Sequence, residues 1–321
     1  MSNILIAGGA GFIGSHLSKR LLTEGHRVIC VDNLITGSKE NIKEPLSNSN
    51  FTFIEYDITT DLSTINYQLS TIDFVFHLAS PASPNHHSKL SYHALPMETM
   101  IANTQGTLAL LKLAEKNNAR FLFASTSEVY GDPLENPQKE SYRGNVSTTG
   151  PRSVYDEAKR FGETLTAYFW RDKNVNARIV RIFNTYGPLM QKGDKRMVID
   201  FINQALRQEP ITIFGDGEQT RSLCYIDDLV DGLMKMMFSD KTNKEILNLG
   251  SEEEHTVLEY AQIIKQLTNS SSEIIHSEDL PEDDPKARCP DITKAKELLE
   301  WEPHVSLEEG LQKTIEYFSS L

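Results

Sequence analysis

The chain has little cysteine and no long apolar segment. Its three cysteines, Cys30, Cys224 and Cys289, are widely spaced and form no C-x-x-C pair. This pattern argues against a disulfide framework or a zinc site and is typical of a reducing cytoplasm. No apolar stretch approaches the roughly 20 residues that span a bilayer, and no basic region precedes the first apolar run. We therefore expect a cytoplasmic protein without a membrane segment.

Positive charge is also scarce. Lysine and arginine number 32 against 45 acidic residues, which gives the 321-residue chain a formal net charge of −13. Such a surface repels nucleic acid and anionic membranes, so we expect neither as a partner. An anionic substrate would have to meet basic residues that are gathered locally. The length allows one large domain with a smaller lobe, or two domains.

The N-terminal segment combines a short apolar run with a glycine-rich turn. Residues 3–7 (NILIA) predict a buried strand, and a helical pattern follows the glycines as far as Gly25. This context is typical of a dinucleotide-binding loop, because glycine lets the backbone approach a pyrophosphate at the helix N-terminus. The spacing is G-x-x-G-x-x-G, and the alternative is a tight turn without a ligand. The predicted cofactor residues here are Gly8, Gly11, Phe12, Ile13 and Gly14.

The second predicted strand, residues 27–31, ends at an acidic residue. Asp32 lies 18 residues after Gly14, where a carboxylate can accept hydrogen bonds from an adenosine ribose. The same carboxylate would repel the 2′-phosphate of NADP, so this position favours NAD as the cofactor. The alternative is an aspartate that only ends a strand.

Strands and helices then alternate along the chain. Strands are predicted at 51–56, 72–77, 120–125 and 174–183, and helices at 94–117 and 155–171. This alternation predicts an α/β fold with a Rossmann-type, doubly wound parallel sheet, whose ligands bind beyond the carboxyl ends of the strands. The residues at these ends that could contact the dinucleotide are Asp57, Ile58, Leu78, Ala79 and Ser80.

Beyond about residue 184 the elements become shorter. We expect residues 1–184 to form the nucleotide-binding domain. Residues 185–321 should form mainly a smaller α/β substrate lobe, with about 220–250 returning to the first domain. Helices are predicted at 197–207, 226–238, 256–267 and within 292–321, and extended segments at 211–214 and 246–249.

The strongest catalytic candidates are Tyr155 and Lys159. They are four apart on a predicted helix, so they share one face. A free phenol has a pKa of about 10, and a neighbouring ammonium would favour the phenolate and its use as a base. A hydroxyl from Ser125 or Thr126 could complete the proton path. The alternative is an ordinary helix pair, since Y-x-x-x-K is common.

A loop that contains three histidines precedes helix 94–117. His86 and His87 are adjacent, and adjacent histidines cannot readily bind one ion. His93 follows, and no carboxylate or cysteine pattern accompanies the three histidines in the sequence. We interpret the segment as a polar loop and predict no metal site.

Taken together, these motifs resemble the extended short-chain dehydrogenase/reductase family that acts on nucleotide sugars. The similarity covers nearly the whole chain, through GGAGFIGSHL, VDNLITG, HLAS, STSEVYG, YDEAK, RIFNTYGP, FGDGEQTR and YIDDLVDGL. HLASPASP, GPRSVYDEAKR and DDPKARCPDITKAK resemble the branch that decarboxylates UDP-glucuronate. Ser127-Glu128 replaces the Asp-Glu of sugar dehydratases, and simple 4-epimerases usually lack the glutamate. The loop after HLASPASP is about five residues longer than in that branch. This difference leaves the identity of the sugar substrate more open than the fold or the cofactor.

The resemblance implies a redox-neutral reaction with NAD as the cofactor and a UDP-sugar as the substrate. Oxidation of UDP-glucuronate at C4 would be followed by loss of carbon dioxide, protonation at C5 and re-reduction to UDP-xylose. The alternatives are a UDP-sugar 4-epimerase or related epimerase/dehydratase, and a non-catalytic dinucleotide-sensing protein. Relatives pair two helices from each subunit, which implies a homodimer through 94–117 and 155–171.

The resemblance also assigns roles to residues. Lys159 would activate Tyr155, Thr126 would bind the 4-oxygen, and Glu128 and Arg221 would position the carboxylate and the C5 proton donor, although Arg221 could instead bind the diphosphate. The implied catalytic set is thus Tyr155, Lys159, Thr126, Glu128 and Arg221. Further implied cofactor contacts are Asn33, Thr36, Gly37, Asn103, Tyr155 and Lys159. The implied substrate contacts are Ser80, Ser127, Glu128, Tyr155, Asn184, Arg221 and Arg288.

Overall fold

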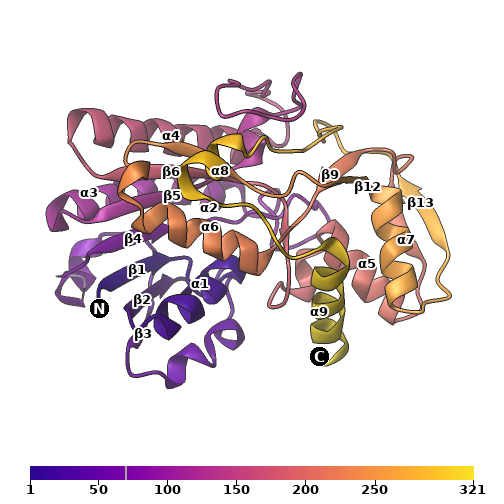
Figure 1. Ribbon diagram of the computed structural model, residues 1–321, viewed down its shortest axis with the longest axis horizontal. Helices are drawn as coiled ribbons and strands as arrows, with labels where there is room; N and C mark the ends of the chain where they lie inside the picture. The colour runs from indigo at the N-terminus through magenta and orange to yellow at the C-terminus, as the bar shows by residue number, and fades with distance from the viewer. Residues whose placement is uncertain (69–70) are drawn as a thin grey trace.

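The structure, a computed structural model, describes residues 1–68 and 71–321. Its centre is a seven-stranded parallel sheet with the order β11-β6-β5-β4-β1-β2-β3 (Figure 1). The strands are β1 (Asn3–Ala7), β2 (Arg27–Asp32), β3 (Phe51–Glu55), β4 (Phe74–His77), β5 (Arg120–Thr126), β6 (Ala177–Ile182) and β11 (Ile246–Leu249). The predicted α/β fold with a doubly wound parallel sheet is confirmed.

Helices cover both faces of this sheet. One face carries α1 and α6, which pack together, and the other carries α3 and α4. Their bounds are α1 (Phe12–Thr23), α3 (Thr107–Asn117), α4 (Ser153–Asp172) and α6 (Ile226–Phe238). Strand side chains point alternately to the two faces, so Ile4 lies in the core with α1 and Leu5 in the core with α3. The continuous apolar run NILIA therefore contributes to two cores, as expected of a strand that is covered on both faces.

Three predicted elements differ from the structure by more than two residues or are divided. Helix 94–117 is divided: α2 (Pro96–Ile101) begins with a proline, and one π-helical turn (Ala102–Gly106) precedes α3. Strand 174–183 begins only at Ala177, because the positive φ of Asn174 (56°) turns the chain. The region 292–321 forms two helices, α8 (Thr293–Leu299) and α9 (Leu307–Ser319), because Glu300 adopts a left-handed conformation that ends the first.

The smaller lobe is assembled from short elements. A parallel pair, β8 and β13, is flanked by α5 and α7 (Figure 1). The short pair β9–β12 lies beside α7, and the short pair β7–β10 contacts α6. The bounds are β7 (Thr185–Tyr186), α5 (Met197–Leu206), β8 (Ile211–Phe214), β9 (Thr220–Ser222), β10 (Cys224–Tyr225), β12 (Glu254–Thr256), α7 (Val257–Leu267) and β13 (Ile274–Glu278). Within the described ranges, no helix is long and apolar enough to cross a membrane.

The chain returns to the large sheet between these elements. α6 packs on the sheet, and β11 pairs with β6 at its edge. We propose to divide the domains at residue 184, with about 220–250 belonging to the nucleotide-binding domain.

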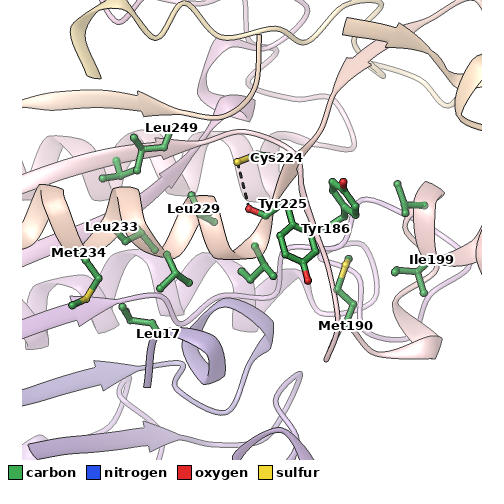
Figure 2. Close-up of a cluster of buried hydrophobic side chains, with 14 of the residues drawn as sticks. Leu17, Tyr186, Met190, Ile199, Cys224, Tyr225, Leu229, Leu233, Met234 and Leu249 are labelled. Carbon is green, nitrogen blue, oxygen red and sulfur yellow. Dashed lines mark hydrogen bonds between the residues drawn. The ribbon is translucent and has the colours of Figure 1, made fainter. Parts of the chain in front are cut away.

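One apolar core joins the two lobes. Figure 2 shows Leu17 of α1 and Leu229 of α6 in the same cluster as Tyr186, Met190 and Ile199 of the smaller lobe. Leu229 is fully buried, so its truncation to alanine would cost about 2–5 kcal/mol. Because this core is continuous, it fixes the positions of the two lobes relative to each other.

Candidate active site

A cleft of about 770 Å³ opens at the carboxyl ends of the parallel strands and extends to the smaller lobe. The structure brings the sequence-predicted site residues together here. All of them line the cleft except Gly37, Asn103 and Arg288.

These three residues support the lining from behind. A side chain at Gly37 would come 2.7 Å from Asp32 Oδ1, so the glycine makes room for that carboxylate. Asn103 is buried and donates a hydrogen bond from Nδ2 to Ser80 Oγ (2.8 Å). Arg288 is 1% exposed and donates from Nη1 to the carbonyl oxygen of Ser127 (2.9 Å). Direct ligand contact stays a prediction for all three.

The glycine turn after β1 is closely packed against the chain around it. Gly8 has a φ of 82°, and a Cβ there would lie 2.7 Å from the amide nitrogen of Ala79. A Cβ at Gly14 would lie 2.2 Å from the carbonyl oxygen of Gly8. α1 begins at Phe12, and its N-cap Gly11 makes no side-chain cap, so the first helical amides are available to an anion. This geometry fits a dinucleotide pyrophosphate.

Asp32 lies at the end of β2 with its carboxylate in the cleft. It accepts hydrogen bonds from the amide nitrogens of Ala10 (2.9 Å) and Leu34 (2.8 Å), which tie it to the glycine turn. Each carboxylate oxygen keeps a second acceptor site, which suits the hydroxyls of a ribose. Burial raises the pKa of Asp32, and the two amide hydrogen bonds oppose that shift. The residues therefore fit NAD at this end of the cleft.

Tyr155 and Lys159 lie on α4 and face the end of β5. The Lys159 ammonium donates to the carbonyl oxygen of Ala124 (2.7 Å) and lies 5.8 Å from the centre of the Tyr155 ring. Burial lowers the pKa of Lys159 to about 7, against the opposing charge of Glu163. Burial also raises the pKa of Tyr155 to about 12, although a hydrogen bond with Thr126 favours the phenolate. Burial therefore has the larger effect on Tyr155 in this state, and activation of the phenol by Lys159 stays a prediction.

Glu128 lies at the centre of a buried charged cluster beside Tyr155. Its carboxylate accepts hydrogen bonds from Arg152 and from Arg288 Nη2 (3.1 Å). Asp284 joins the cluster, with 3.0 Å to Arg152 Nη1 and 2.8 Å to Arg221 Nη2. Burial alone would raise the pKa of Glu128, but Arg288 and Arg152 outweigh it and lower the pKa to about 2. Glu128 is therefore ionised at neutral pH and holds two arginines in place.

Three residues of the site were missed by the sequence analysis. Arg152 comes three positions before Tyr155, and this helical spacing was the available signal. Asp284 lies in an acidic loop, where the sequence gives no indication of its partners. The Tyr92 ring stacks on the Tyr155 ring with 4.9 Å between centroids and 7° between planes. The Tyr92 hydroxyl is buried, lacks a hydrogen-bond partner among the described residues, and belongs to a side chain that lines the cleft.

The loop before α2 crosses from the large lobe to the smaller one. Ser83 Oγ donates to the carbonyl oxygen of Asp194 (2.8 Å), Asn85 Nδ2 to that of Lys195 (2.7 Å) and Ser88 Oγ to that of Gly193 (2.6 Å). These are three direct hydrogen bonds to one segment of the opposite wall. The loop in which the sequence departs from the decarboxylase pattern therefore joins the two walls of the cleft.

The fold and the site define the class of protein. A family model described as the NAD dependent epimerase/dehydratase family matches residues 4–250, and the chain belongs to this family. NAD is accordingly its cofactor, as the sequence predicted.

Individual relatives are similar over nearly the whole chain. A UDP-glucuronic acid decarboxylase 5 from Arabidopsis thaliana is 50% identical over 96% of this chain and 86% of the relative. A UDP-glucuronic acid decarboxylase 1 from Danio rerio is 49% identical over 98% of this chain and 72% of the relative. Among solved structures, a UDP-glucose 4-epimerase from Thermotoga maritima, with UDP-glucose, is 34% identical and has a TM-score of 0.89 over 99% of both chains. A Bacillus cereus UDP-glucuronic acid 4-epimerase, in complex with UDP-glucuronic acid and NAD, is 31% identical with a TM-score of 0.85 over 99% of both chains.

Proposed function

We propose that this protein decarboxylates UDP-glucuronate to UDP-xylose with NAD and without net oxidation or reduction. The observation that carries the proposal is the Glu128–arginine cluster beside Tyr155, which suits a sugar carboxylate. The relatives named above that are 49% and 50% identical are UDP-glucuronic acid decarboxylases, which supports the same assignment.

Tyr155 would act on the sugar 4-hydroxyl. Its phenolate would remove the hydroxyl proton as a hydride leaves C4, and Thr126, the hydrogen-bond partner of Tyr155, would orient the 4-oxygen. Lys159, with a pKa of about 7, can exchange a proton close to neutral pH. A bound NAD would supply the acceptor and later donor of the C4 hydride, and the positive charge of its oxidised ring would favour the phenolate of Tyr155. The buried Tyr92 hydroxyl is placed to hydrogen-bond the sugar.

The charged cluster would hold the carboxylate end of the sugar. A 4-ketone turns the C5 carboxylate into a β-keto acid, and loss of carbon dioxide leaves an enolate that conjugation stabilises. Arg152, Arg221 and Arg288 carry three positive charges, against the two negative charges of Glu128 and Asp284. One positive charge is left over, which attracts an anionic substrate in a protein that is acidic overall. We assign Glu128 and Arg221 to positioning the carboxylate and the proton donor for C5.

The remaining contacts divide between the two ligands. Asn33, Thr36, Asp57, Ile58, Leu78 and Ala79 line the NAD end of the cleft. Ser80, Ser127 and Asn184 also line the cleft, and we assign them to the nucleotide sugar.

A UDP-sugar 4-epimerase is the second candidate. The Thermotoga maritima epimerase has a TM-score of 0.89 with this chain, and epimerisation at C4 needs the same base and cofactor. The two reactions differ in whether carbon dioxide leaves. The Ser127-Glu128 pair and the curated relatives favour decarboxylation.

The test is to incubate the purified protein with UDP-glucuronate and NAD and to measure carbon dioxide and the sugar nucleotide. We expect carbon dioxide and UDP-xylose in equal amounts. UDP-galacturonate without carbon dioxide would establish the epimerase instead. A released 4-keto pentose would mean that the last reduction is missing. The control is Tyr155→Phe, which should form neither product.

We also propose that the protein is a homodimer. α4 exposes Phe161 (49%) and Tyr168 (42%), seven residues apart and therefore on one helix face. Exposed apolar side chains on one helix face support an interface between two copies. Light scattering at micromolar protein should give twice the chain mass, and Phe161→Glu should give a monomer.

The three cysteines support a reducing compartment, and we propose the cytoplasm. All three are buried and unpaired. Burial raises the pKa of each thiol, so none is a reactive thiolate at neutral pH.

A further inference from the structure

The loop before α2 and the strand β13 bring three metal-ligand side chains together at the rim of the cleft. His87 Nε2 lies 2.9 Å from Glu278 Oε1, and His86 Nε2 lies 3.4 Å from Glu278 Oε2. One ligand atom from each residue lies within 4.8 Å of the other two. The sequence analysis predicted no metal site because adjacent histidines cannot readily bind one ion and no carboxylate or cysteine pattern accompanied them. Glu278 is a carboxylate that only the fold brings to them.

We propose that His86, His87 and Glu278 bind one divalent ion of the zinc class, and that this ion clamps the loop to β13. Neutral imidazole and carboxylate are zinc ligands at about 2.0–2.2 Å, which places tetrahedral ligand atoms about 3.3–3.6 Å apart. The separation between His86 and Glu278 already has this value, and that between His87 and Glu278 is slightly shorter. The two separations end on different oxygens of Glu278, so the side chains must rotate to share one ion.

Packing already orients the three side chains. Phe214 of β8 lies beside both imidazoles, 5.9 Å from the His86 ring centre and 6.3 Å from that of His87. Glu278 is the register partner of Phe214, and the β8–β13 register shifts between His276 and Glu278. A bulge of this kind redirects a side chain, here toward the two rings. Phe214 thus supports both imidazoles, and the bulge turns the Glu278 carboxylate toward them. The three side chains therefore form a prepared site rather than a chance surface contact.

The ligand set decides which ion the site would take. Two imidazoles with one carboxylate favour zinc, nickel or copper over magnesium and calcium, which prefer oxygen ligands. The three side chains are 40–46% exposed, so a fourth position is open to water and the ion can exchange with the solvent. A simple ion pair between Glu278 and a protonated imidazole is the competing interpretation. The two interpretations differ in the form of the ring, because metal binds the neutral imidazole whereas an ion pair needs the protonated one.

The functional consequence is mechanical. Three hydrogen bonds already join this loop to residues 193–195 of the smaller lobe. A metal would add a bond between the loop and a second segment of that lobe, β13. It would therefore stabilise the closed rim of the cleft without touching Tyr155. This inference does not depend on which sugar nucleotide the cleft binds.

The experiment is calorimetric titration of the tag-free, NAD-loaded protein with zinc chloride at pH 7.5, after treatment with a chelator. We expect one zinc per chain, and at least tenfold weaker binding in Glu278→Gln and in the double variant His86→Ala/His87→Ala. The matched control is His255→Ala, because His255 also pairs with carboxylates, at 2.9 Å from Glu253 and 3.8 Å from Glu259, but has no second imidazole. Zinc affinity should be unchanged in this control.

A second readout tests the clamp itself. Zinc should slow amide hydrogen exchange in residues 84–96 of the wild type and of His255→Ala, and leave it unchanged in Glu278→Gln. Thermal unfolding of each variant without zinc verifies that it is folded. Absence of saturable zinc binding in the wild type would overturn the proposal. So would equal binding by Glu278→Gln, or exchange in residues 84–96 that does not respond to bound zinc.

Discussion

The two ends of the cleft are built in different ways. The end that we assign to NAD is formed mainly by strand ends and turns within the first 80 residues, and it presents backbone amides and short side chains. The end that we assign to the sugar is formed by charged side chains that come from distant parts of the chain, among them Glu128, Arg152, Arg221, Asp284 and Arg288. One end is therefore a local motif, whereas the other exists only when both lobes have packed.

This difference has an energetic consequence. At the NAD end, hydrogen bonds between neighbouring segments fix the geometry, and the loss of one side chain should affect mainly the ligand it touches. At the sugar end, each charge is held by another buried charge. Removing one partner leaves the other without compensation, which is costly in a desolvated site. Substitutions there should affect folding as well as binding.

The largest effect is expected where the two ends meet. Tyr155→Phe removes the base but keeps the ring that stacks on Tyr92. Turnover of UDP-glucuronate should fall by about 10²–10⁴-fold, the range for loss of a general base, while NAD stays bound. Steady-state rates and the NAD content of the purified variant check both parts. Tyr168→Phe, an exposed tyrosine on the same helix, is the control. A variant with the normal rate would remove Tyr155 from the mechanism.

The next effect tests the charge balance of the sugar end. The folded-state pKa of Glu128 is about 2, below the ordinary value of 4.5, so the ionised carboxylate stabilises the fold at and above pH 5. That stabilisation, about 3 kcal/mol from the size of the shift, disappears as the pH falls toward 2. Glu128→Gln should therefore lower the free energy of unfolding at pH 7 and should differ little from the wild type near pH 2.

Denaturant unfolding between pH 2 and 7 measures this difference. Glu157→Gln is the matched control, because Glu157 is half-exposed on α4 and pairs with Arg160 at 3.4 Å. Its loss should cost less than about 1 kcal/mol at any pH. A Glu128→Gln difference that does not depend on pH would show that the carboxylate charge does not stabilise the cluster.

Asp32→Ala should affect the NAD end alone. Loss of charge-assisted hydrogen bonds to the ribose, each about 1.5–3 kcal/mol, should weaken NAD about 10–100-fold. Binding of UDP at the other end should be unaffected. Calorimetry with each ligand gives both values. Glu55→Ala is the control, since Glu55 is the register partner of Asp32 on β3 but pairs at the surface with Lys39. Weakened UDP binding in Asp32→Ala would mean that the two ends are coupled.

The same comparison explains what the sequence could and could not predict. The glycine turn, Asp32 and the Tyr155–Lys159 pair are short-range patterns with a physical reason for each spacing, and the structure places all of them in one cleft. Predicted strands 3–7, 211–214 and 246–249 and helix 226–238 coincide with β1, β8, β11 and α6, because apolar periodicity and turn residues fix them locally.

Residues whose role depends on tertiary contacts were not predictable in this way. Asp284 and Glu278 lie in an acidic stretch that reads as solvated surface, and only the packing of the smaller lobe brings them to Arg152 and to His87. The stacking of Tyr92 on Tyr155 likewise requires the loop to fold back over α4. The effect of burial on the pKa of Tyr155 was hidden for a related reason, since burial cannot be read from the spacing of two residues.

The smallest expected effect tests most directly the surplus positive charge of the arginine cluster. Asp284→Asn keeps the size of the side chain but raises the net charge of the cluster by one, so an anionic UDP-sugar should bind more tightly. With solvent-screened charges a few ångströms apart, the gain is about 1 kcal/mol, or about fivefold in KM, and it should shrink as salt is added. NAD affinity should stay the same. Asp283→Asn, the exposed neighbour, is the control. A raised KM in Asp284→Asn would show that Asp284 orients Arg152 and Arg221 for the substrate. It would contradict the view that Asp284 competes with the substrate for these two arginines.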